Sequence, residues 1–367
     1  MPETIDTEKK EKLVYLDSAR GIAALMVLFG HFINWRHPEK ISSQVTSLFI
    51  NANDAVCFFF VLSGFVLSYK YLVLGHTLDI RKFYVNRLFR LWPAYFLTIV
   101  INALYSIRKQ FDVNNLLDLF VYNNKGFWEE AILIRGRTQF YGPGWTLVIE
   151  LIMSFFMPFA ILIARKGIKP AYWLLIAVLL MGVSYVFQVQ FVLGVIISCL
   201  FNYINTGSFK ETKWYKYRYI LLFVSFIFYS LRQIDRMSPL GPTYKYVAAY
   251  LGLDFFIYSG FAAFVFIIAI IQSKKVKQLL EHSIMRYIGK ISYGIYLMHW
   301  LIVLALFDNW DYFLGLFGST ELTFTILLIG CLACTLISAT IVHYAIELPF
   351  IRMGKRITQK MKPSTLF

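Results

Sequence analysis

Ten long apolar runs are the feature that most constrains the fold of this chain. A helix needs about 20 mostly apolar residues to cross the hydrocarbon core of a bilayer. Only 16% of the 367 residues are charged, against about a quarter in soluble domains, so a soluble or disordered chain is excluded. We therefore predict an all-α fold, a polytopic membrane helix bundle with about ten transmembrane helices. The predicted spans are residues 14–35, 54–74, 91–107, 144–164, 170–187, 189–205, 217–231, 246–271, 286–307 and 322–346.

The Lys and Arg residues between the runs predict how the bundle is oriented. If the N-terminus is cytoplasmic, the segments on that side hold 23 of the 36 Lys and Arg, and the segments on the other side hold ten. Cytoplasmic loops are enriched in these residues, so both termini are expected inside, as tails at 1–13 and 351–367 around a membrane domain at 14–350. This clustering accounts for the net charge of +15 without nucleic acid as a partner. The longest segment between spans, 108–143, is expected outside, as a lid or an acceptor-contact surface.

Ionisable side chains inside the runs are the first candidates for a functional site. Each is costly to insert into a bilayer and needs a cavity or a partner. Asp17 and Arg20 lie three residues apart, on one helix face near the expected cytoplasmic end. They form either an ion pair at a helix end or the wall of a site that faces a cytoplasmic cavity.

His31 and Glu150 are the candidates for the outer half of the membrane. His31 lies about 22 Å along its helix from Leu16, and Glu150 lies about 9 Å inside Gly144, at 1.5 Å per residue. These depths allow the two side chains to meet. A histidine oriented by a carboxylate is a workable general base. The alternative is a buried pair that only joins two helices.

The segment before the third span carries Arg87 and Arg90 on one helix face, at the expected cytoplasmic surface. The planar guanidinium suits phosphate because it donates two hydrogen bonds at once, although the same residues also serve as positive-inside anchors. Ser63, Trp145 and Tyr293 are further candidate hydrogen-bond donors in the spans. The two arginines therefore form either an anion-binding site or a positively charged anchor at the start of the third span.

The run IGKISYGIYLMHW places His299 in the outer half, about 18 Å from Tyr287. It either contacts substrate or forms an interhelical hydrogen bond. Near the end of the chain, the segment with His343 and Glu347 either forms an interhelical hydrogen bond or marks a helix stop at Pro349. Cys331 and Cys334 form a C-x-x-C pair inside an apolar run, without a second pair or a nearby histidine in sequence, so no metal site is expected.

Seven stretches resemble the membrane-bound acyltransferase family 3, in the order and in the spans that the family shows. They are LDSARGIAALMVLFGHF, FFFVLSGFVLS, NRLFRLWPAY, WTLVIE, FVLGVII, IGKISYGIYLMHW and IELPF, and they are spread from residue 16 to residue 350, so the resemblance spans nearly the whole chain. The resemblance implies an integral O-acyltransferase of surface glycans in the inner or plasma membrane. It would move an acyl group, usually acetyl, from acyl-CoA to a hydroxyl of a cell-surface or lipid-linked carbohydrate.

The family's pattern also assigns roles to residues. Its essential histidine and arginine of the first span match His31 and Arg20, its R-x-x-R element matches Arg87 and Arg90, and its fourth-span glutamate resembles Glu150. Acetyl-CoA is then a co-substrate, and no permanently bound cofactor is expected. Direct attack by the acceptor and an acyl-histidine intermediate both remain open.

We combine these roles in one hypothesis. Asp17, Arg20, His31 and Glu150 are the predicted catalytic residues, with His31 as general base oriented by Glu150. Acyl-CoA is predicted to contact Ser63, Arg87 and Arg90, and the acceptor is predicted to contact Trp145, Tyr293 and His299.

Two other functions are compatible with the same residues. A transporter also uses intramembrane His, Arg, Asp and Glu to carry protons or solutes. In a purely structural scaffold they would act as interhelical hydrogen bonds. The sequence does not identify the acceptor, the acyl group or the oligomeric state.

Overall fold

Helices make up all the regular secondary structure that the computed structural model describes, which covers residues 13–36, 46–122, 126–133, 138–181, 186–205, 207–237 and 255–362. The expected all-α class is therefore confirmed. The main helices are α1 (Val14–Arg36), α3 (Ala52–Leu72), α4 (Ile80–Ser106), α7 (Gly144–Ala164), α8 (Ile168–Leu180), α9 (Val186–Asn205), α12 (Arg218–Met237), α14 (Phe255–Gln272), α16 (Ser283–Lys290), α17 (Ser292–Asp308), α19 (Thr320–Val342) and α20 (Leu348–Lys360).

Seven of the described helices are long and apolar enough to cross a membrane, or eight if the bent pair α16–α17 is one span. The structure thus confirms a membrane helix bundle but not the expected count of ten. The run expected at 170–187 is the 13-residue helix α8, shorter than a bilayer requires. The run expected at 217–231 lies in α12, which is not among the seven. Part of the run expected at 246–271 lies outside the described residues.

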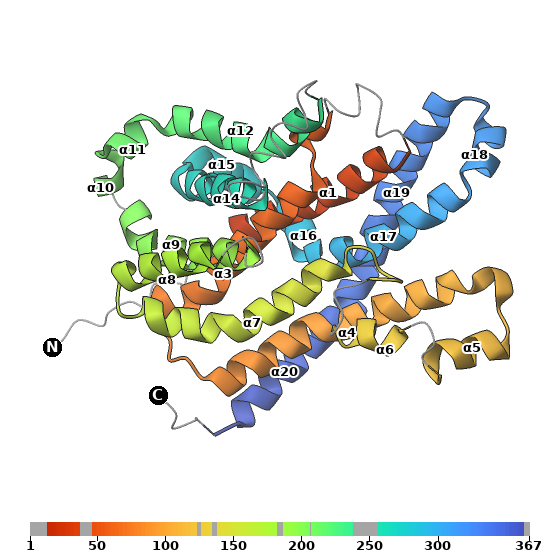
Figure 1. The fold of residues 1–367 in the computed structure, drawn as a ribbon, viewed down its shortest axis with the longest axis horizontal. Coiled ribbons are helices and arrows are strands. Elements are labelled where there is room, and N and C mark those ends of the chain that lie inside the picture. Colours follow the sequence, from red (N-terminus) through yellow and green to blue (C-terminus); the bar gives the residue numbers. More distant parts are fainter. Residues whose placement is uncertain are drawn as a thin grey trace.

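Helices α1 and α3 form the centre of the bundle. α1 packs against α3, α16 and α17, and α3 packs against α9, α14 and α7 (Figure 1). The tightest crossing joins α3 to α9, where a Cβ on Gly64 would come within 2.2 Å of the carbonyl oxygen of Phe191. Small residues let helix backbones approach closely in a membrane, where burial of apolar surface gives little driving force.

Two breaks in regular helix lie beside the centre. The chain bends by 68° between α16 and α17, so that Ser292 begins a new helix at mid-bundle. After α19, residues His343–Glu347 form a π-helical segment that leads directly into α20. Of the two alternatives for this segment, the helix stop at Pro349 is excluded, because this proline lies in the first turn of α20, where its missing N–H is tolerated.

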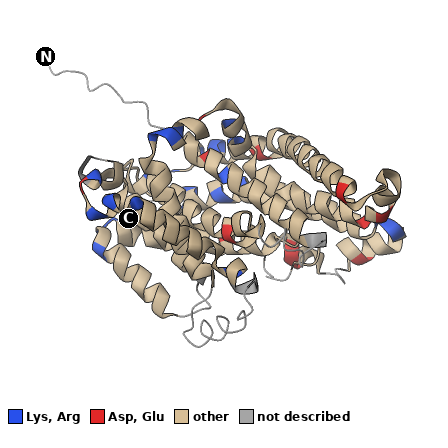
Figure 2. Cartoon of the chain, turned by 90° about the horizontal axis from the view of Figure 1, so that it is seen from above, with Lys and Arg blue, Asp and Glu red and all other residues tan. Residues whose placement is uncertain are grey.

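The segment 351–367, expected as a partly frayed tail, is helical as far as Lys360 and packs against α4. In Figure 1 the start of α4 and the ends of α7 and α20 lie at the same end of the bundle. Figure 2 shows Lys and Arg gathered toward this end, near the C-terminus, and several of the Asp and Glu at the opposite end.

Candidate functional site

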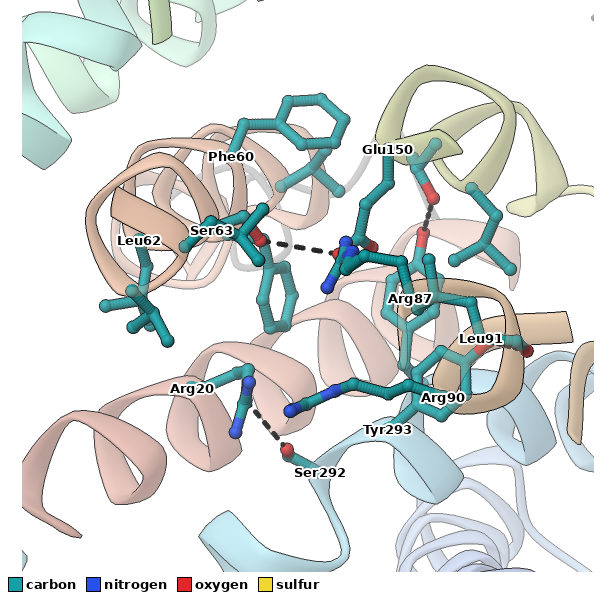
Figure 3. A pocket seen from close by; sticks show the side chains of 17 residues that line it. Arg20, Phe60, Leu62, Ser63, Arg87, Arg90, Leu91, Glu150, Ser292 and Tyr293 are labelled. Atoms are coloured by element: carbon teal, nitrogen blue, oxygen red, sulfur yellow. Dashed lines mark hydrogen bonds and ion pairs between the residues drawn. The ribbon is translucent and has the colours of Figure 1, made fainter. Parts of the chain in front are cut away.

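A cavity of about 820 Å³, part of it open to solvent, lies between α1, α3, α4, α7 and α17 (Figure 3). Five helices that are distant in sequence thus contribute to one site. Its apolar lining comes largely from α3. Its polar lining consists of Arg20, Ser63, Arg87, Arg90, Thr146, Glu150, Ser292, Tyr293 and Tyr296.

Arg87 is held rigidly on one wall of the cavity. Asp79 caps the start of α4 by accepting a hydrogen bond from the Lys82 backbone N–H, so the helix runs unbroken through Arg87. The Arg87 Nη2 atom lies 2.7 Å from Glu150 Oε1, and its Nε donates to Ser154 Oγ at 3.1 Å. An ion pair with so little exposure is stable only because both charges are matched.

Arg20 and Arg90 face each other across the cavity (Figure 3). Arg20 forms an ion pair with Asp17 and donates from Nε to Ser292 Oγ at 3.2 Å, so α1 is tied to the start of α17. Among the described residues Arg90 has no ion-pair partner. Three guanidinium groups against one lining carboxylate make the cavity positive, which favours an anion there.

The sequence suggested that Glu150 orients His31, but in the structure Glu150 has other partners. Its carboxylate accepts from Arg87 and, at 3.5 Å, from Ser63 Oγ. Helix depth gives a position along the membrane normal but not the direction in which a side chain points. Glu150 lines the cavity and pairs with Arg87 of α4, whereas His31 does not line the cavity and contacts α17, so the two predicted partners have different neighbours.

His31 instead contacts two residues of α17. Its ring stacks on the ring of His299, with centroids 5.4 Å apart and an interplanar angle of 17°, and the edge of Trp300 packs against it at 5.2 Å. His31 is half-buried and His299 is completely buried. The structure therefore brings together two imidazoles that the sequence placed in the outer half independently.

Tyr296 and Thr146 stand between the arginine cavity and the two histidines. Both residues line the cavity, and their hydroxyl oxygens are 2.6 Å apart. The Tyr296 ring also contacts the ring of His299, with centroids 5.6 Å apart. His31 itself does not line the cavity, and Tyr296 both lines the cavity and contacts the histidine pair, so we call Tyr296 and Thr146 the partition.

A carboxylate holds the loop above this partition. In the expected outer segment, α6 (Phe127–Ala131) carries Glu130, which is 2% exposed and accepts backbone N–H bonds from Gln139, Phe140 and Tyr141 at 2.8–2.9 Å. Burial raises the pKa of the Tyr141 phenol well above its ordinary value, so this group stays neutral and donates to the Tyr296 carbonyl at 2.5 Å.

The same loop also contacts the indole ring of Trp300, which packs on His31. A Cβ on Gly142 would lie 2.5 Å from the ring of Trp300, the same ring that packs on His31. The segment expected as a lid is thus a packed loop, at least over residues 138–143. Nothing in the sequence pattern marks Glu130, because one of two adjacent glutamates in a polar segment looks like a solvated surface charge.

The other predicted site residues divide into two groups. Ser63 and Tyr293 line the cavity, and the Tyr293 hydroxyl donates to the Leu91 carbonyl at 2.7 Å. Trp145 does not line it, because its indole packs among Phe187 and Phe256 on the opposite face of α7. Trp145 therefore lies outside this cavity, and its contact with the acceptor stays a prediction. Asp17 does not line the cavity and forms an ion pair with Arg20, which does.

Comparison with known proteins finds a family whose model matches most of the chain and two relatives that match parts of it. The family described as an acyltransferase domain matches residues 13–343. The chain is 27% identical over 183 residues to Nodulation protein 10 of Rhizobium leguminosarum bv. viciae, covering 45% of this chain and 48% of that protein. It is 33% identical over 99 residues to Protein 2 in picA locus of Rhizobium radiobacter, covering 26% of this chain and 47% of that protein. The chain thus spans about half the length of these curated relatives. No solved structure matches it.

Proposed function

Because the chain belongs to the acyltransferase family that matches residues 13–343, and is therefore a membrane acyltransferase, we propose that it moves an acyl group from acyl-CoA to a hydroxyl of a carbohydrate. The simplest donor is acetyl-CoA on the cytoplasmic side of the cell membrane. The acceptor is a cell-surface or lipid-linked glycan that approaches from the other side.

The observation that carries the proposal is the cavity with three arginines. CoA carries several phosphate charges, and guanidinium groups bind phosphate with strong charge-assisted hydrogen bonds. Arg90 is the most available of the three, since Arg20 and Arg87 already hold carboxylates. We assign the phosphates to this end of the cavity and the thioester to the end at Tyr296 and Thr146.

The reaction then takes place at the partition. His31 removes the proton from the acceptor hydroxyl, whose oxygen attacks the thioester carbonyl carbon. A C–O bond forms, the C–S bond breaks, and the proton passes from His31 to the departing sulfur of CoA. Tyr296 lines the cavity and contacts His299, and its hydroxyl is our candidate donor for the oxyanion once it turns from Thr146.

A transporter is not favoured, because the family match is to acyltransferases. The two functions also differ in their chemistry. A transporter moves its solute unchanged, whereas an acyltransferase consumes acyl-CoA and leaves a covalent mark on its acceptor.

The test compares surface glycans from cells with the gene, without it, and with the His31→Ala variant. We expect mass spectrometry to show that acyl increments disappear without the gene and are not restored by the variant. The variant has to reach the membrane in normal amount, and its thermal unfolding is the control. Unchanged acylation without the gene would contradict the function, and normal acylation by the variant would contradict the role of His31.

A further inference from the structure

His299 is held in one tautomer by the backbone. Its Nδ1 atom lies 2.6 Å from the Tyr296 carbonyl oxygen, which also accepts the Tyr141 hydroxyl. A carbonyl oxygen only accepts hydrogen bonds, so Nδ1 carries the proton. The side chain is completely buried and has no carboxylate contact, and an unpaired buried charge is very costly. The ring is therefore neutral, and its Nε2 atom has a lone pair.

That lone pair has no partner. Nε2 of His299 is fully buried and makes no hydrogen bond with any described residue. Most buried polar side-chain atoms in native proteins are satisfied, so an exception calls for an explanation. No described residue therefore supplies a hydrogen-bond donor at this point, beside His31.

The number of hydrogens on the reacting hydroxyl limits which group can donate to His299 Nε2. The reacting hydroxyl has a single hydrogen, and His31 takes it. Since the rings of His31 and His299 stack rather than point at each other, His299 Nε2 has to receive a different hydrogen. The rings lie within 5.4 Å, so that hydrogen belongs to a group close to the reacting hydroxyl.

We propose that His299 binds the acceptor by accepting a hydrogen bond from a second O–H or N–H group next to the hydroxyl that is acylated. The inference rests on the proposed function and narrows its substrate class. The acceptor is then a polyol or amino-sugar unit with adjacent donors, rather than an isolated alcohol.

Two substitutions at His299 test the roles of its two ring nitrogens separately. The side-chain amide of His299→Asn can replace Nδ1–H as the donor to Tyr296, but it has no acceptor at the position of Nε2. The longer side chain of His299→Gln can place its carbonyl oxygen near that position, but it loses the bond to Tyr296. The variants are compared with wild type in cells that lack the chromosomal gene.

We expect His299→Asn to lower glycan acylation at least about tenfold with little change in thermal unfolding, and His299→Gln to retain several times more activity than His299→Asn. Binding of acetyl-CoA to the purified protein should be the same in all three. Wild-type acylation by His299→Asn, or a loss that follows only the loss of stability, would overturn the proposal. Absence of acylation by the wild type would instead contradict the proposed function on which it rests.

Discussion

Two arginines one turn apart on α4 have different surroundings and should respond differently to mutation. Arg87 is buried against Glu150 and Ser154, whereas Arg90 reaches into the cavity without an ion pair among the described residues. The first holds the cavity wall together, and the second is available to a ligand.

Arg87→Ala should lower the free energy of unfolding by up to about 3 kcal/mol, since it leaves the carboxylate of Glu150 without its partner. Thermal unfolding in detergent measures this. The double variant Arg87→Met/Glu150→Gln is the control and should recover most of the loss, because no charge is then left unpaired. Equal unfolding midpoints for Arg87→Ala and wild type would show that the ion pair contributes no stability.

Arg90→Ala should leave the unfolding midpoint almost unchanged and weaken acetyl-CoA binding at least about tenfold, the loss expected for one charge-assisted bond to phosphate. Isothermal titration with acetyl-CoA measures the binding. The neighbouring exposed Leu88, on another face of α4, provides the control variant Leu88→Ala. Undiminished binding by Arg90→Ala would remove this arginine from the donor site.

Tyr296→Phe should reduce transfer about 100-fold if its hydroxyl stabilises the oxyanion, with a stability loss of only about 1 kcal/mol for the bond to Thr146. The acyl content of surface glycans gives the activity. Thr146→Val, which removes the other hydroxyl of the pair, serves as the comparison. If Tyr296→Phe keeps full activity, the oxyanion donor is another group.

Residue types in the spans predicted much of the cavity but not its pairings. Arg20, Ser63, Arg87, Glu150 and Tyr293 do line it, since charged groups in a bilayer have to converge on a shared polar space. The prediction that Glu150 pairs with His31 was wrong, because the depth of a residue along a helix does not tell in which direction around the helix axis its side chain points. The stacking of His31 on His299 could not be foreseen for the same reason.

At the scale of elements, the contact between α1 and α16 determines where Arg20 meets Ser292. A Cβ on Gly289 would lie 2.5 Å from the Asp17 carbonyl, and one on Gly21 would lie 2.7 Å from the Gly289 nitrogen. Backbone therefore touches backbone at the point where the chain bends into α17. The sequence predicted one continuous span here, because an apolar run shows length and not direction.

Gly289→Ala should separate these helices and lower both the unfolding midpoint and acetyl-CoA binding, with a cost typical of forced overpacking, about 1–3 kcal/mol. Gly330→Ala on α19 is the matched control. A Cβ there would meet nothing within 4 Å, so this variant should be neutral or slightly stabilising. The same result for both variants would show that the close approach is unimportant.

At the scale of the whole molecule, the runs of apolar residues predicted the class of fold. A segment that crosses a bilayer has to satisfy its backbone hydrogen bonds internally, and a run of about 20 apolar residues does so as a helix. They did not predict the number of spans. An apolar run that forms a short helix, such as α8, differs little in hydropathy from a run that crosses the membrane.

Green fluorescent protein fused after Phe367 should fluoresce, and alkaline phosphatase fused at the same point should be inactive, because the basic C-terminal segment is expected in the cytoplasm. Fusions within residues 123–125 should give the opposite pair of results. Phosphatase activity at the C-terminus would reverse the proposed orientation and, with it, the side from which acyl-CoA enters.

The partition formed by Tyr296 and Thr146 also bears on whether ions can leak through the enzyme across a membrane that carries a proton gradient. If each half of the site opens to a different compartment, this one pair of side chains is what keeps ions from following the substrates. A bond can then be made across the bilayer while no whole molecule passes, and the cell's proton gradient is left intact.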